Sequence, residues 1–187
     1  YQKNELAQWG FLARQWRFKT GKQITTPPIA TGRVVNFASL DNSLYSITAG
    51  SPRLQWQSET DSPVSAPVTY HDGFLYVACE DFNLYCLNAE SGNSRWQPFP
   101  SGFPIRRTPR VIGQQVFIFP DAGGLFSISA LTGKRTWWRH GVKNFVSASI
   151  ERLYTVDRIG NVVILRRGDG AVLGTMPLPG VAAWVWS

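Results

Sequence analysis

The sequence has few residues of the kinds that perform covalent chemistry or bind metals. Its 187 residues include two histidines, two cysteines and one methionine. No HExxH motif, Walker loop or GxGxxG motif occurs, and His71 and His140 each stand alone. No convergent pair of carboxylates can be picked out as a general acid and base. The sequence therefore assigns no catalytic residue, no metal ligand and no cofactor site.

Long hydrophobic runs are also missing. A membrane-spanning helix needs roughly 18 apolar residues in succession, whereas the longest candidate, residues 181–186, has the length of a strand. The chain opens on Tyr1 and shows no basic segment followed by an apolar stretch. We therefore expect no transmembrane segment, and a chain that is either processed or cut from something longer.

The composition is that of a globular β-protein. Hydrophobic residues make up 43% of the chain, aromatic residues 13% and charged residues 17%. A chain of this length can bury a core of ordinary size within one domain. The many flat, rigid rings are typical of a pleated core.

Positive charge is concentrated in the second half of the chain. Residues 1–94 hold 7 Lys or Arg and 8 Asp or Glu, whereas residues 95–187 hold 12 and 4, which gives net charges of −1 and +8. Most of the excess is arginine, whose planar guanidinium suits carboxylates and phosphates. An acidic partner would explain this excess, and so would a solvated basic face that keeps the protein soluble.

An internal repeat of about 40 residues is the strongest signal in the sequence. Each period contains four short strand-like runs separated by turn residues, which is the size and pattern of a propeller blade. We therefore predict an all-β fold of four four-stranded antiparallel meanders, part of a larger ring or completed by a second chain. Two residue series keep the period: Trp16, Trp56, Trp96 and Trp137 at spacings of 40, 40 and 41, and Asp41, Asp81, Asp121 and Asp157 at spacings of 40, 40 and 36.

The repeat predicts where each blade begins and ends. In the second blade it places the outer strand at residues 95–97. The full division is a lead-in with the outer strand of a preceding blade at 1–21, blades at 22–60, 61–100, 101–143 and 144–179, and the start of a further strand at 180–187.

The recurring residues have structural interpretations. A tryptophan on the outer strand can fill the gap between wedge-shaped blades, so we expect Trp16, Trp56, Trp96 and Trp137 to be packing residues. The recurring aspartates are expected to cap hairpin turns.

Cys79 and Cys86 lie on consecutive strands of one hairpin. With a turn centred on residues 81–82 they would share a face as diagonal neighbours, too far apart for an easy disulfide, so we predict two buried thiols.

Two junctions between third and fourth strands, residues 87–96 and 128–137, resemble the Leu-Asp-Ala-x-Thr-Gly-x-x-x-Trp signature of pyrroloquinoline quinone (PQQ)-like propeller repeats. That superfamily includes quinoprotein dehydrogenases and the scaffold lipoprotein of outer-membrane β-barrel assembly. The resemblance covers residues 22 to about 178 and implies the propeller fold. It also implies a bacterial periplasmic or extracytoplasmic location. The usual aspartate is replaced by Asn88 and Ser129 here, and the fourth repeat has Leu173 in place of the tryptophan.

Three functions follow as hypotheses. The favoured one is a non-catalytic scaffold with short loops that binds a protein or peptide. Its candidate binding patch comprises Arg106, Arg107 and Arg110, which suit a carboxylate or phosphate. The alternative is that these arginines pair with Asp and Glu of neighbouring turns. The resemblance also implies a fragment of a PQQ-dependent dehydrogenase, although no catalytic or calcium-binding role can be assigned to a residue. The third is a module for an acidic polymer or a lipid surface. Nucleic acid is disfavoured, because the aromatic residues follow the blade period instead of alternating with the arginines.

Overall fold

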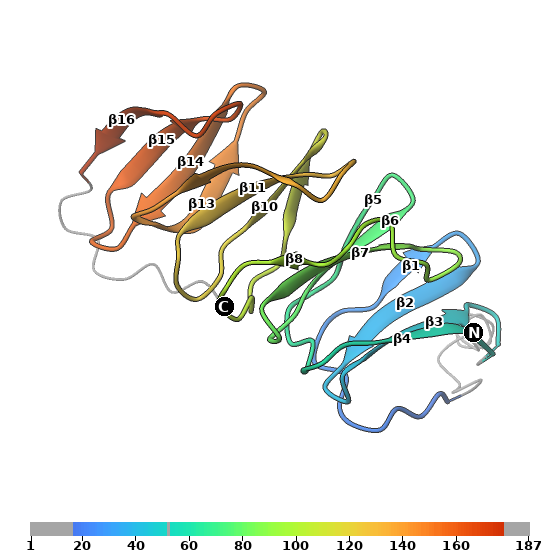
Figure 1. Cartoon of the computed structure of the whole chain (residues 1–187). Coiled ribbons are helices and arrows are strands. Elements are labelled where there is room, and N and C mark those ends of the chain that lie inside the picture. The colour runs from blue at the N-terminus through green and yellow to red at the C-terminus, as the bar shows by residue number, and fades with distance from the viewer. Residues whose placement is uncertain (1–16, 52, 178–187) are drawn as a thin grey trace, which may run out of the picture.

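The computed structural model describes residues 17–51 and 53–177, which form an all-β protein of four four-stranded antiparallel sheets. The predicted fold class is confirmed. Figure 1 shows the sheets side by side in a curved row, in the order of the chain. In each sheet the strands are hydrogen-bonded in sequence order, which is the meander of a propeller blade.

The first two sheets, blades 1 and 2, occupy residues 29–59 and 69–100. Blade 1 consists of β1 (Ile29–Thr31), β2 (Val34–Ser39), β3 (Ser43–Thr48) and β4 (Leu54–Glu59). Blade 2 consists of β5 (Thr69–His71), β6 (Phe74–Ala78), β7 (Asn83–Asn88) and β8 (Phe99–Pro100).

The last two sheets, blades 3 and 4, occupy residues 110–139 and 142–176. Blade 3 consists of β9 (Arg110–Ile112), β10 (Gln115–Ile118), β11 (Leu125–Ser129) and β12 (Arg135–Arg139). Blade 4 consists of β13 (Val142–Ala148), β14 (Arg152–Asp157), β15 (Val162–Arg166) and β16 (Val172–Met176). The division of the chain into separate domains stays a prediction. Trp16 and residues 180–187 lie outside the described residues.

The outer strand of blade 2 differs from the prediction. Residues 95–97 form no strand, and the short β8 pairs with the start of β7 through Leu84 opposite Phe99. Pro98 and Pro100 flank Phe99, and a proline has no N–H to donate to a strand ladder. The outer edge of blade 2 is therefore shorter than that of its neighbours.

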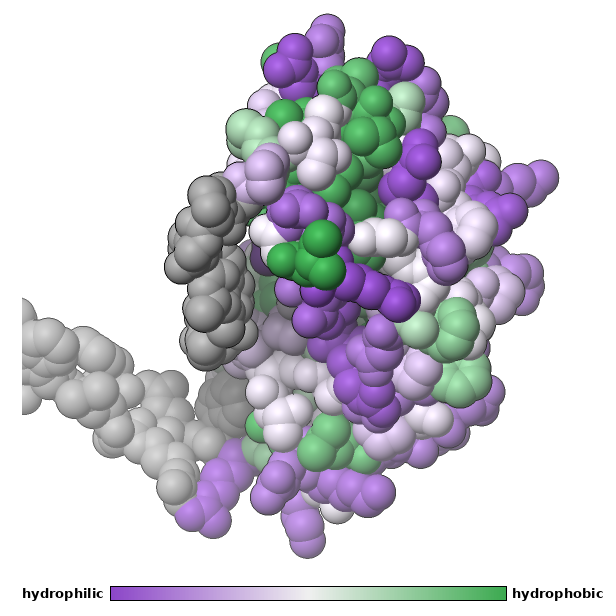
Figure 2. Space-filling view, turned by 90° about the vertical axis from the view of Figure 1, so that its left-hand side faces the viewer, coloured by the Kyte–Doolittle hydropathy of each residue, from purple (hydrophilic) through white to green (hydrophobic). Residues whose placement is uncertain are grey.

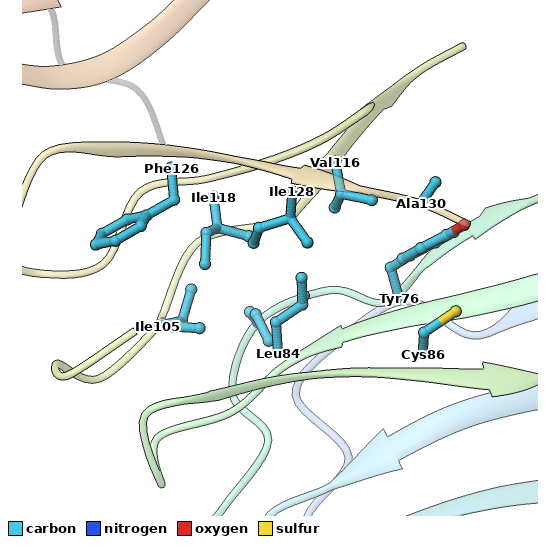
Figure 3. Close-up of a cluster of buried hydrophobic side chains, with 11 residues drawn as sticks. Tyr76, Leu84, Cys86, Ile105, Val116, Ile118, Phe126, Ile128 and Ala130 are labelled. Atoms are coloured by element: carbon cyan, nitrogen blue, oxygen red, sulfur yellow. The ribbon is translucent and has the colours of Figure 1, made fainter. Parts of the chain in front are cut away.

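Hydrophobic side chains fill the space between successive blades. Between blades 2 and 3, the side chains of Tyr76, Leu84 and Cys86 lie opposite those of Val116 and Ile118, as Figure 3 shows. Similar clusters join blade 1 to blade 2 and blade 3 to blade 4. One blade cannot bury both faces alone, so these shared cores hold the array together.

The two cysteines are free and buried, as predicted, but the prediction that they share a face is wrong. The hairpin places Cys86 opposite Tyr76, whereas the predicted turn centred on residues 81–82 would place it opposite Val77. The difference is one residue in the turn, where Phe82 adopts a positive φ of 76°. Cys79 consequently packs toward blade 1 and Cys86 toward blade 3. Burial raises the pKa of the Cys79 thiol to about 11 and that of Cys86 to about 12.

None of the described residues belongs to a helix long and apolar enough to cross a membrane.

Candidate functional site

One face of the array is built by the hairpin turns between the second and third strands. The connection entering each of the first three blades is hydrogen-bonded to that blade's own turn. The bonds run from Leu40 N to Gln23 O (3.0 Å), from Glu80 N to Pro63 O (3.3 Å) and from Asp121 N to Pro104 O (2.9 Å). We call this surface, formed by the turns at residues 40–42, 80–82 and 120–124 and their connections, the turn face.

The outgoing connections fix the same turns from the other side. The hydroxyl of Thr60 donates to Asn42 O at 3.1 Å, and that of Ser101 donates to Phe82 O at 2.9 Å. Each of these turns is therefore bonded to the chain that enters the blade and to the chain that leaves it. A rigid surface of this kind loses little conformational freedom when a partner binds.

The repeating aspartates of blades 1 and 2 stabilise their own turns. Asp41 accepts hydrogen bonds from Tyr45 Oη (2.8 Å) and from the backbone N–H of Gly21 (2.7 Å). Asp81 accepts one from Tyr85 Oη at 2.5 Å. Burial alone would raise the pKa of Asp41, but the bonds from Tyr45 and the backbone outweigh it and lower that pKa. Burial and the bond to Asp81 raise the pKa of Tyr85.

Blade 3 departs from this pattern, because its aspartate, Asp121, forms an ion pair instead of a bond to a tyrosine. The turn after Asp121 is one residue longer, and Phe126, which has no hydroxyl, takes the place of the tyrosine. Asp121 instead binds Nη1 of Arg106, whose Nη2 lies 3.0 Å from Glu80 Oε2. Arg106 thus bridges a carboxylate of blade 2 and one of blade 3.

The charges of this bridge are mutually compensated. The hydroxyl of Ser65 donates to Glu80 at 2.5 Å and is the main cause of that carboxyl's lowered pKa, to which Arg106 adds. The pKa of Arg106 is raised in turn by its bonds to Glu80 and Asp121. Arg106 therefore pairs with turn carboxylates, one of the two alternatives that the sequence left open for the arginines.

The other two arginines of the predicted cluster are directed toward blade 4. Arg107 Nη1 donates to the backbone carbonyl of Lys143 at 3.4 Å, and the guanidinium carbon of Arg110 lies 5.7 Å from the ring centre of Phe145. Within the part of the chain that the structure describes, no carboxylate lies within 4.0 Å of a charged nitrogen of Arg107, Arg110 or Lys143. We call Arg107, Arg110 and Lys143 the basic cluster.

Sequence reasoning missed Lys143. It lies 36 residues after Arg107 and on the next blade, and only the stacking of blades 3 and 4 brings the two together. The net charge of the second half was the signal that pointed to this region, but charge alone could not select the residue.

Three of the recurring tryptophans bridge successive blades. Each projects from the end of one blade and donates its indole N–H to a backbone carbonyl of the next. The bonds run from Trp56 to Ala89 O (3.1 Å), from Trp96 to Ala130 O (3.3 Å) and from Trp137 to Arg167 O (2.9 Å).

A glycine of the next blade lies directly beneath each of these rings. A Cβ atom added to Gly133 would lie 2.5 Å from Cδ2 of Trp96, and Gly92 and Gly170 approach Trp56 and Trp137 in the same way. The three glycines have positive φ angles, between 71° and 72°. Each of the three recurring tryptophans therefore contacts a glycine of the next blade. That these tryptophans act in packing alone stays a prediction.

The meander, the fixed turns and the repeated Trp–Gly contact define a β-propeller protein with PQQ-like repeats. A sequence model of the family described as "Outer membrane protein assembly factor BamB" matches residues 41–185. The match covers more than half of the chain, so the chain belongs to this family. A comparison with curated protein sequences found no significant match.

Solved structures with the same fold include a BamB protein, an alcohol dehydrogenase and a designed protein. BamB from Moraxella catarrhalis is 14% identical with a TM-score of 0.70, over 82% of this chain and 49% of that one. Quinohemoprotein alcohol dehydrogenase ADHIIG from Pseudomonas putida HK5 is 15% identical with a TM-score of 0.68, over 86% and 35%. The computationally designed Ika4 is 13% identical with a TM-score of 0.67, over 79% and 93%. The chain thus spans about half the length of the BamB structure, and these identities establish the fold alone.

No residue of the described ranges can be assigned to a PQQ or calcium site. Over the described ranges, no three His, Cys, Asp or Glu side chains gather closely enough to hold a metal ion. Each of the three tryptophans at the blade junctions has a glycine packed against its ring.

Proposed function

We propose that this protein is a non-catalytic propeller scaffold that binds an acidic protein or peptide on its turn face. The observation that carries the proposal is the basic cluster of Arg107, Arg110 and Lys143, which stands beside rigid turns without a carboxylate partner among the described residues. Unpaired arginines can form bidentate bonds to carboxylates. Membership of the BamB family supports an assembly role and an extracytoplasmic location in a bacterium.

The test removes the cluster and measures anion binding. The variant Arg107→Ser/Arg110→Ser/Lys143→Ser should bind poly-glutamate at least about tenfold more weakly than the parent at 0.1 M salt, because three contacts to the polyanion are lost. Parent binding should also weaken steeply toward 1 M salt, since the screening length falls from about 10 Å to about 3 Å. Isothermal titration calorimetry measures both effects.

The control variant removes the same charge elsewhere. Lys19→Ser/Lys22→Ser/Arg33→Ser takes three exposed cations from the blade 1 end of the array and leaves the basic cluster intact. If both variants lose affinity equally, only net charge matters and the turn face is not the site. If heparin binds the basic cluster more tightly than poly-glutamate does, the protein is a general polyanion-binding module.

A further blade is proposed to complete the ring next to blade 4. The buried residues of β14 and β15 alternate with half-exposed ones, which include Tyr154 and Ile164. In blade 2 the corresponding side chains are buried against blade 3. Figure 2 shows hydrophobic side chains gathered at this end of the molecule, where Met176 is 51% exposed. The additional blade belongs either to the same polypeptide or to a second copy that shares the ring.

A further inference from the structure

The junction between blades 2 and 3 differs in chemistry from the junction between blades 1 and 2. Strand register and repeated hydrogen bonds define which positions correspond. Phe126 pairs with Trp138 as Tyr45 pairs with Gln57, and Leu84 pairs with Phe99 as Leu44 pairs with Ser58. Ser101 donates to Phe103 O as Thr60 donates to Ser62 O.

Four positions of the repeat have changed to plain aromatic side chains at this one junction. Phe99 corresponds to Ser58, Phe103 to Ser62 and Lys22, Phe126 to Tyr45 and Tyr85, and Trp138 to Gln57. Each of the corresponding side chains has a polar group, and the hydroxyls of Tyr45 and Tyr85 donate to turn aspartates. At the preceding junction the corresponding positions are Ser58, Ser62 and Tyr85, so stacking of the blades does not require Phe99, Phe103 and Phe126.

The four side chains gather at the outer rim. The ring centres of Phe99 and Phe126 are 5.8 Å apart, and those of Phe126 and Trp138 are 6.0 Å apart. Phe103 packs against Gly123, a residue of the lengthened turn. Phe103 and Trp138 are nevertheless 43% and 45% exposed, so these rings are not core residues.

Three of these rings, those of Phe99, Phe126 and Trp138, line a hollow of about 540 Å³. Phe99 and Pro100 line it from blade 2, whereas Phe126, Trp138 and Arg135 line it from blade 3. We call this hollow the aromatic notch. The short β8 and the two residues that follow it form the blade 2 wall of the notch.

Two polar groups, the indole N–H of Trp138 and the guanidinium of Arg135, contribute to the notch. Trp138 is held in place by its indole N–H, which donates to Gly123 O at 2.5 Å. Arg135 is exposed and forms no ion pair with any carboxylate of the described residues. The notch thus combines half-exposed aromatic rings with a free guanidinium, the residue types that dominate binding energy at protein interfaces.

We propose that the aromatic notch is a second docking site, which takes a peptide segment carrying an aromatic side chain next to an Asp or Glu. The ring of the peptide enters between Phe99 and Trp138, and its carboxylate pairs with Arg135. Charge complementarity selects an acidic segment, because residues 95–187 carry a net charge of +8. The inference rests on the proposed scaffold function only in that both sites take a protein partner.

The experiment titrates four capped decapeptides that differ at two positions: Phe with Asp, Ala with Asp, Phe with Asn, and Ala with Asn. Binding is followed through the indole N–H signal of Trp138 in ¹H–¹⁵N spectra. Only the Phe and Asp peptide should bind at millimolar concentration or below. Each single replacement should weaken binding at least about fivefold, since one anchor is lost.

Protein variants assign the binding to the notch. Trp138→Gln introduces the residue found at the corresponding place in blade 1, and Arg135→Gln removes the cation; each should weaken binding about tenfold. Lys134→Gln removes a neighbouring exposed charge and should leave binding unchanged. An unchanged melting temperature shows that the variants fold. Shifts of the backbone N–H signal of Gly123 provide a second measurement of peptide binding.

Several outcomes would overturn the proposal. These are equal affinity for all four peptides, no binding at 1 mM, and affinity that Trp138→Gln leaves unchanged. A response to phosphatidylglycerol vesicles alone would assign the notch to a lipid surface, and a Trp138-dependent dimer in sedimentation would assign it to a second copy. The variant without the basic cluster should still bind the Phe and Asp peptide, so failure of the turn face and failure of the notch are distinguishable.

Discussion

A glycine-to-alanine substitution beneath Trp96 should destabilise the junction between blades 2 and 3 more than backbone strain explains. At Gly133, φ is +71° and an added Cβ would lie 2.5 Å from the indole ring. Alanine in the left-handed region costs roughly 1–2 kcal/mol. The added methyl also has no space, so the ring must leave its position.

The cost of moving the ring follows from its burial. A tryptophan side chain can bury roughly 200 Å², Trp96 is partly buried, and a displacement that removes half of this contact exposes about 100 Å². At roughly 25 cal/mol per Å² this is worth about 2.5 kcal/mol. Together with the backbone strain, Gly133→Ala should therefore lower the free energy of unfolding by about 3.5–4.5 kcal/mol. Trp96→Ala should cost about 2–4 kcal/mol, near the lower end of the range for a large-to-small change in a core.

Gly113 provides the matched control in the same blade. Its φ is +58°, and an added Cβ would have no heavy atom within 4 Å, so Gly113→Ala meets the backbone strain alone. Urea unfolding followed by circular dichroism measures both variants, and Gly133→Ala made in the Trp96→Ala background should cost no more than Gly113→Ala. If Gly133→Ala and Gly113→Ala differ by less than about 0.5 kcal/mol in the parent, the Trp–Gly contact does not hold the blades together.

Two further predictions concern charge and cofactor. Arg106→Gln should reduce stability slightly near pH 7. The folded protein lowers the pKa of Glu80 below its ordinary 4.5. The stabilisation from the Arg106–Glu80 pair is therefore present above pH 4.5 and is lost as the pH falls through the lowered pKa. The stabilities of parent and variant should converge in acid-unfolding curves. Titration with PQQ and calcium should show no stoichiometric heat, whereas tight binding would favour the dehydrogenase interpretation.

The period of the sequence was sufficient to predict the meanders, because one residue series marks the turns and another marks the outer strands. Details that depend on a single residue in a turn were not predictable. The positive φ of Phe82 moved Cys86 to the opposite face of its sheet, and Pro98 displaced the outer strand of blade 2. The positive φ belongs to the turn itself, since Asn42 adopts it at the same place in blade 1, and the shortened strand follows from a proline that has no N–H to donate.

The candidate sites were less accessible to sequence reasoning, because both are formed by residues of different blades. Arg106, Arg107 and Arg110 are close in sequence, yet the structure directs Arg106 to Glu80 and Asp121 and the other two toward blade 4. A cluster of like charges in one segment therefore does not define one surface.

The comparison of junctions separates residues that maintain the fold from residues available for recognition. The Trp–Gly contact recurs at all three described junctions, so it meets a requirement that every pair of blades shares. The aromatic notch occurs between blades 2 and 3, whereas Phe99 and Phe103 correspond to Ser58 and Ser62 at the preceding junction. A feature required for stacking should recur with the period, whereas a binding site needs to occur only once. The departure of Phe99 and Trp138 from the repeat is therefore a stronger indication of function than the conspicuous tryptophans that keep it.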